Sequence, residues 1–188
     1  MIIVTTFKAL RKTIAIIINP IYTPIARFIF YINGAVIGKG LSVNGFLHID
    51  ITRRGKLTVG RSFHLNSGLN HNVIGRQQKC IFWVEGSVSI GNNVGMSSTA
   101  IICNHQITIG NNVTIGGNTV IYDTDFHILN PQQRNDKNLD KQGAKKAAVF
   151  IADNVFIGAH TTILKGVVIG ENSVVGAYDQ HCYFPSWR

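Results

Sequence analysis

Aliphatic residues recur every six positions along much of the chain. From Ile90 onward the sequence divides into hexads that begin with an aliphatic residue or Met, often followed by Gly and then Asn. The first positions are Ile90, Met96, Ile102, Ile109, Ile115, Ile121, Ile151, Ile157, Ile163, Ile169 and Val175, with Thr108 as one extra residue. This period fits neither an amphipathic helix, whose apolar residues recur at i, i+3, i+4 and i+7, nor an antiparallel sandwich with turns every 8–12 residues or so.

Each hexad predicts one short extended side and one corner of a prism-shaped solenoid. The first residue points inward, and Gly, Asn and Asp suit the corner because they tolerate positive φ. Three sides make a coil of about 18 residues, and stacked parallel coils bury a continuous column of Ile and Val. Less regular coils include Ile37, Val43, Ile49, Val59 and Leu65, and residues 70–80 have the composition of a corner insertion.

The expected fold class is therefore all-β, a parallel β-helix over residues 35–177. An N-terminal helical or apolar segment (1–34) precedes it, and a tail (178–188) follows it. The repeat stops at residues 127–149, which are polar and charged, and a loop of this length in a compact solenoid is usually functional.

The charge is concentrated in one half of the chain. The 188 residues carry a net charge of +9, and residues 1–79 hold eleven Lys and Arg against the single acid Asp50. Such a half favours a polyanion, which can be a membrane surface, a phosphate-bearing substrate or nucleic acid. Nucleic acid is the least favoured of the three because the sequence has no helix-turn-helix, zinc-finger or RNP pattern.

Residues 14–32 are apolar, but Pro20, Pro24 and Arg27 interrupt them, so no run reaches the ~20 residues of a spanning helix. Two interpretations remain open. The segment is a helical lid on the end of the solenoid, or a basic interfacial helix that rests on anionic lipid. The odd number of cysteines (Cys80, Cys103 and Cys182) argues against a disulfide framework and fits a cytoplasmic protein.

The segments IGNNVTIGGNTVIYDTDFH (109–127) and IADNVFIGAHTTILKGVVIGENSVVGA (151–177) resemble the hexapeptide-repeat acyltransferases. The resemblance is strongest to O-acetyltransferases of surface polysaccharide and lipopolysaccharide biosynthesis, and more distant to galactoside and maltose acetyltransferases. It implies a left-handed parallel β-helix, a homotrimer, acetyl-CoA as co-substrate and a saccharide acceptor.

The resemblance also implies which residues carry the chemistry. His127 matches the general base that removes the proton of the acceptor hydroxyl, a task that suits imidazole because its pKa lies near working pH. Asp125 or Asp123 would orient this ring, although a corner-capping role is equally open for each. Asn104 falls where the similar enzymes have an acceptor-binding Asp.

The expected contacts of coenzyme A follow from the same comparison of motifs. They are Ala159, Ala177, Phe156 and Gly158. Separately, Lys145 and Lys146 in the loop are candidate partners for a phosphate because of their charge, although such a run of charges is also typical of a solvated face. Phe156 stands where the family usually has Trp, and the family's further coil after VGA, with its Thr and Lys contacts, is replaced here by residues 178–188.

Other chemistries are less favoured by the sequence. A zinc site is not expected because no His-x4-His pair occurs, and nothing marks Cys103 as an activated nucleophile. Two further functions remain as alternatives, namely N-acetylation of a nucleotide-linked amino sugar and a non-catalytic β-helical scaffold.

Overall fold

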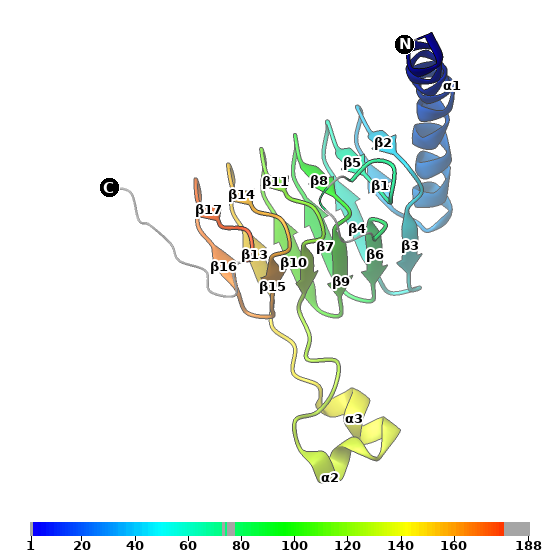
Figure 1. The fold of residues 1–188 in the computed structure, drawn as a ribbon. Coiled ribbons are helices and arrows are strands. Elements are labelled where there is room, and N and C mark those ends of the chain that lie inside the picture. Colours follow the sequence, from blue (N-terminus) through cyan, green and yellow to red (C-terminus); the bar gives the residue numbers. More distant parts are fainter. Residues whose placement is uncertain (1, 73, 75–77, 179–188) are drawn as a thin grey trace.

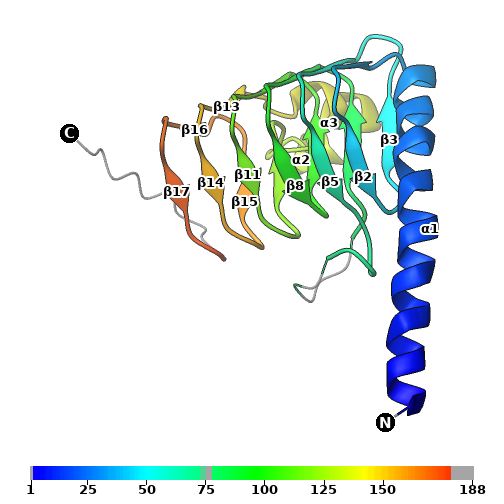
Figure 2. The ribbon, with the colours of Figure 1, turned by 90° about the horizontal axis from the view of Figure 1, so that it is seen from above.

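Three parallel sheets form the three sides of a prism in the computed structural model, which describes residues 2–72, 74 and 78–178 (Figures 1 and 2). Every third strand along the chain belongs to the same sheet. The predicted tail, with Cys182, lies almost wholly outside the described residues. The fold is the expected all-β class, a left-handed parallel β-helix.

The sheets run along the length of the stack. The first sheet holds β1 (Val36–Ile37), β4 (Lys56–Val59), β7 (Ser87–Ile90), β10 (Gln106–Ile109), β13 (Val149–Ile151) and β16 (Val168–Ile169). The second holds β2 (Ser42–Asn44), β5 (His64–Asn66), β8 (Gly95–Ser97), β11 (Thr114–Ile115), β14 (Phe156–Ile157) and β17 (Val174–Val175). The third holds β3 (His48–Ile51), β6 (Ile81–Val84), β9 (Ala100–Cys103), β12 (Val120–Tyr122) and β15 (Thr162–Ile163).

The hexad pattern places one aliphatic column inside each sheet. Paired strands bring together Ile90, Ile109, Ile151 and Ile169 in the first sheet, Met96, Ile115, Ile157 and Val175 in the second, and Ile101, Ile121 and Ile163 in the third. All of these side chains are buried. Ten of the eleven predicted inward positions are therefore confirmed.

The prediction that the eleventh residue, Ile102, points inward was wrong. Ile101 pairs with Ile121 and is buried, whereas Ile102 is half-buried on the outer face of β9. A shift of one residue moves a strand's side chains to the opposite face, because side chains alternate along a strand. Thr108 is a paired residue of β10 and not an extra one. The interval from Met96 to Ile101 is one residue shorter than a hexad, and the interval from Ile101 to Ile109 is two residues longer.

Asparagine builds one corner of the prism. Asn93, Asn112, Asn154 and Asn172 all have φ between 55° and 61°, a left-handed conformation that Asn tolerates better than most residues. Their side-chain amides donate from coil to coil, with Nδ2-to-Oδ1 distances of 3.0, 3.0 and 3.1 Å. The corner that the sequence marks with Asn is therefore also a hydrogen-bonded ladder.

Helix α1 (Ile2–Ile32) covers the N-terminal end of the stack (Figure 2). Ala26 and Phe30 are buried against the core, and the rings of Phe30 and Phe82 meet edge to face at 5.6 Å. The hydroxyl of Thr23 accepts a 2.9 Å hydrogen bond from the backbone N–H of Val43. The C-terminal part of α1 is thus a lid, and no helix in the described part of the chain has the length and apolar character needed to cross a bilayer.

The interrupted repeat leaves the prism at the corner between β12 and β13. It contains α2 (Pro131–Arg134) and α3 (Lys137–Gly143), which stand off the stack in Figure 1. Asn130 and Asp136 accept hydrogen bonds from the first-turn N–H groups of these helices, as N-cap residues do. An antiparallel bridge between Thr124 and Lys146 joins the two ends of the insertion.

The aliphatic column should dominate the stability of the fold. We expect Ile115→Ala to lower the free energy of unfolding by about 2–5 kcal/mol, because it opens a cavity in a fully packed column. Its neighbour Thr114 is exposed, so Thr114→Ala should change this free energy by only about 0.5 kcal/mol. Urea denaturation followed by circular dichroism measures both, and equal losses would contradict the inward column.

Candidate active site

A tight turn at the root of the insertion presents His127. The N–H of Phe126 donates to the Thr124 hydroxyl at 3.1 Å, and the N–H of His127 donates to the Asp125 carbonyl at 2.7 Å. Phe126 has a φ of 62°, a left-handed conformation that costs a bulky residue about 1–3 kcal/mol. Backbone strain of this kind concentrates at functional sites, and here it directly precedes the expected base.

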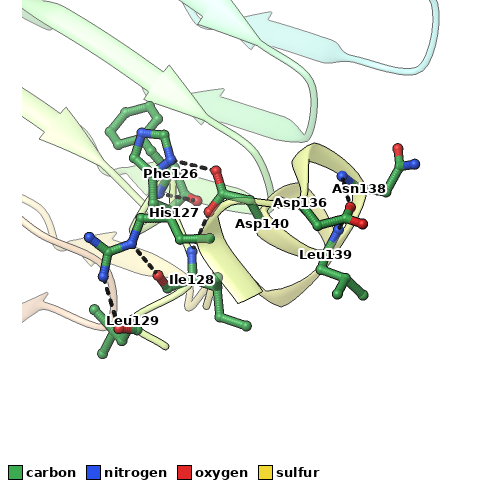
Figure 3. A network of polar contacts seen from close by, with 10 residues as sticks. Phe126, His127, Ile128, Leu129, Asp136, Asn138, Leu139 and Asp140 are labelled. Carbon is green, nitrogen blue, oxygen red and sulfur yellow. Dashed lines mark hydrogen bonds and ion pairs between the residues drawn. The ribbon is translucent and has the colours of Figure 1, made fainter. Parts of the chain in front are cut away.

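The carboxylate of Asp140 fixes the ring of His127. Asp140 Oδ2 lies 2.7 Å from His127 Nδ1, and Asp140 Oδ1 accepts the N–H of Ile128 at 2.8 Å (Figure 3). These two hydrogen bonds, the one from His127 first, lower the pKa of Asp140 from its ordinary 3.8. The side chain of His127 is 68% exposed and that of Asp140 only 16%, so the ring is held from behind and stays open to a substrate.

The expectation that Asp123 or Asp125 would hold the ring is corrected by these contacts. Asp123 is fully buried and accepts the N–H groups of Asn104 (2.7 Å) and His105 (2.8 Å). Asp125 forms an ion pair with Lys165, at 2.7 Å between Oδ1 and Nζ. Asp123 therefore caps the β9–β10 corner, and Asp125 fastens the root of the insertion to the next coil.

Cys103 lies beside Asp123 and is not activated. Its Sγ is 3.3 Å from Asp123 Oδ2. Burial, and secondly the negative charge of Asp123, raise the pKa of this thiol to about 12. Because the thiolate is the nucleophilic form, Cys103 is a poor candidate for a covalent acyl carrier.

A small groove opens next to the His127 turn. Its volume is about 190 Å³, and its walls are Trp83, Glu85, Asn104, Thr124, Phe126, Lys141, Ala144 and Lys146. Asn104 Nδ2 donates to Glu85 Oε2 at 2.9 Å, which leaves the amide oxygen of Asn104 as an acceptor. Two aromatic side chains and several polar groups around a space smaller than most ligand pockets suit a single sugar ring.

The expected coenzyme A residues gather at a different corner. Gly158 and Ala159 follow Phe156 on β14, and Ala177 lies one coil further on. A Cβ on Gly158 would come within 2.5 Å of the backbone nitrogen of Ala177, so only Gly fits this close approach between coils. Phe156 is half-exposed on the outer face of the second sheet. Small residues and an apolar wall therefore line this corner.

The two groups of residues border opposite edges of the third sheet. The corner at Ala159 precedes β15, whereas the insertion with His127 follows β12 in the neighbouring coil. The three residues of β12 span about 10 Å at 3.3 Å per residue. Lys145 lies with the His127 group, because its carbonyl accepts the N–H of Asp125 at 2.9 Å. Within the described residues, the expected site residues thus fall into two groups, one at each end of the strands of the third sheet.

Several residues of the site were missed by the sequence analysis. Asp140 is the most important, and its only signal is its place one turn after Asp136, a typical N-cap residue. Trp83 and Glu85 come from a coil with no motif, and the solenoid brings them beside Asn104. Contacts between coils of this kind leave no trace in the local sequence.

Comparisons with known proteins agree with the fold. Residues 148–178 match the family model described as bacterial transferase hexapeptide (six repeats). The chain is 41% identical over 73 residues to a galactoside O-acetyltransferase of Lactococcus lactis subsp. lactis (strain IL1403), a match that covers 38% of this chain and 32% of the relative.

A second galactoside O-acetyltransferase, from Escherichia coli (strain K12), is 32% identical over 104 residues, which are 50% of this chain and 48% of the relative. The chain thus aligns with half or less of the length of these curated relatives. No solved structure matches it significantly.

The bonds to Asp140 predict a pH dependence of the insertion. Because folding lowers the pKa of this carboxyl, its hydrogen bonds stabilise the loop above pH 3.8 and are lost as the pH falls through the lowered pKa. The exchange protection factor of the Ile128 amide should therefore fall below pH 3.8, while that of Ile109 in β10 should not. In Asp140→Ala, which removes the acceptor, the Ile128 protection should be low at every pH, and a protection equal to the wild type's would contradict the contact.

Proposed function

We propose that this chain, part of which matches the hexapeptide transferase model and two galactoside O-acetyltransferases, is an acetyl-CoA-dependent O-acetyltransferase that acts on a sugar hydroxyl. The observation that carries the proposal is the exposed imidazole of His127, held at Nδ1 by Asp140 beside a groove of monosaccharide size. The acceptor we propose is a saccharide of a cell-surface polysaccharide or lipopolysaccharide precursor.

His127 acts as the general base in this proposal. The carboxylate of Asp140 favours the tautomer with the proton on Nδ1, and this leaves a lone pair on Nε2 for the acceptor hydroxyl. The hydroxyl oxygen attacks the thioester carbonyl as Nε2 takes its proton. The new C–O bond forms, the C–S bond breaks, and the imidazolium returns the proton to the leaving thiolate of coenzyme A. Asp140 is thus a positioning residue.

The groove beside His127 is the proposed acceptor subsite. The faces of Trp83 and Phe126 would receive the apolar side of a pyranose, and Glu85 and Asn104 would accept hydrogen bonds from its hydroxyls. A ring seated there lies next to the turn that carries His127. This supports a sugar acceptor.

We propose a homotrimer in which the active site is shared between protomers. The corner at Gly158, Ala159 and Ala177 would hold the pantetheine of acetyl-CoA along Phe156, and Lys145 would contact a phosphate. Because one chain carries the base and these contacts at opposite edges of the third sheet, a neighbouring copy is a simple way to complete the site. The similarity to galactoside O-acetyltransferases described above supports acetyl-CoA as the co-substrate.

Replacement of the proposed base should abolish acetyl transfer and leave the fold intact. We expect His127→Ala to lower kcat for acetylation of a sugar hydroxyl about 10²–10⁴-fold, since it removes general-base catalysis. Acetyl-CoA affinity and thermal stability should stay as in the wild type. His64→Ala, which removes an exposed histidine on β5, is the matched control and should leave kcat unchanged.

The same assay separates the alternatives. It measures free thiol release from acetyl-CoA with simple glycosides and, in parallel, with a nucleotide-linked amino sugar. Transfer to the amine alone would replace O-acetylation by N-acetylation. If the protein is folded but calorimetry detects no acetyl-CoA binding, the scaffold alternative is correct. If His127→Ala transfers acetyl groups at the wild-type rate, His127 is not the general base.

The acceptor subsite has its own test. Trp83→Ala should raise KM for the sugar roughly tenfold, equivalent to about 1.4 kcal/mol, and leave KM for acetyl-CoA unchanged. Phe46→Ala removes another exposed aromatic side chain, near the N-terminal end of the stack, and should affect neither constant. A higher KM for acetyl-CoA in Trp83→Ala would instead place the co-substrate in this groove.

A further inference from the structure

Helix α1 carries an apolar stripe that its lid function does not use. The stripe consists of Phe7, Leu10, Ile18, Ile21, Ile25, Phe28 and Ile32, whose side chains are 37–63% exposed. These residues follow one another at intervals of three, four or eight, so they share one side of the helix. The face that packs on the solenoid is a different one, with Ala26 and Phe30 one turn apart.

Because α1 lies across the end of the solenoid, its apolar stripe runs parallel to that end. Both ribbon views show the helix lying across the end of the stack, with its N-terminal part extending beyond the prism (Figures 1 and 2). The stripe therefore runs along the end of the molecule and does not project away from it. A helix that lies in the plane of a bilayer surface presents its apolar side in the same way.

Basic residues border the stripe. Lys8 and Arg27 are on α1, one on each side of the stripe, and Lys39, Arg53 and Arg54 lie in the first coil, where the only acid among residues 1–79 is Asp50. Arg27 also stands at an open, largely apolar groove of about 450 Å³ between α1 and β1, with Pro24, Phe28, Tyr31 and Ile37. A guanidinium beside an apolar groove complements a lipid phosphate above its acyl chains.

From this combination we propose that α1 docks the protein on the surface of an anionic lipid bilayer. The apolar stripe enters the boundary between headgroups and acyl chains, and the lysines and arginines contact the headgroup phosphates. The positive charge favours a bilayer over a second copy of the chain as the partner of the stripe. Two copies would bring their basic residues together and repel each other, whereas an anionic bilayer neutralises this charge. This inference is independent of acetyl transfer.

Sedimentation of the full chain with lipid vesicles tests the proposal. The protein should bind vesicles that contain phosphatidylglycerol and stay in solution with pure phosphatidylcholine, and added salt should weaken the binding. Arg27→Gln should weaken it about fivefold, the factor that corresponds to about 1 kcal/mol per basic residue. Lys137→Gln, which makes the same change of charge on the insertion, is the matched control and should bind as the wild type does.

A second variant decides between the bilayer and a second copy. Ile21→Ser combined with Phe28→Ser should abolish vesicle binding and leave the sedimentation mass and circular dichroism unchanged, since both side chains are exposed. A changed mass in this variant, together with wild-type protein that ignores anionic vesicles, would assign the stripe to contacts between copies. Equal binding to neutral and anionic vesicles would overturn the role of the basic rim.

Discussion

Every structural feature of this protein depends on one packing constraint, the burial of a continuous aliphatic column inside a three-sided coil. Each residue of the column contacts the equivalent residues above and below it, so the strands remain in register over the whole stack. The constraint also sets the corners, where a reversal of direction within two or three residues requires positive φ. Coils that satisfy it differ little in backbone, and this leaves their outer faces free to vary.

The candidate site lies where the aliphatic column is interrupted. The chain leaves the prism after β12 and returns at β13 in register with β10, so the insertion does not disturb the core. Its root is fastened by bonds of three kinds, the Thr124–Lys146 bridge, the Asp125–Lys165 ion pair and the capping of the β9–β10 corner by Asp123. These contacts explain how an exposed histidine can be held in a defined orientation on a long loop.

Much of the fold was predictable because its signal is periodic. A repeated Ile-Gly-Asn-Asn pattern indicates burial and turn geometry in most hexads, and among the inward positions only Ile102 was misplaced, where the spacing departs from six without a change in composition. The site was less predictable for the same reason. His127 stands at a visible break in the repeat, but its partner Asp140 is brought close by two short helices whose packing no local pattern encodes. Trp83 and Glu85 reach the groove through the stacking of coils, and their own coil offers no motif.

The insertion between β12 and β13 keeps the histidine and its carboxylate partner on one continuous piece of chain, closed at its base by a pair of backbone neighbours. This segment is therefore a single structural unit. A solenoid can gain, lose or exchange such a loop at a single corner while its strands stay in register, so the segment that holds this histidine can change more readily than the coils that support it.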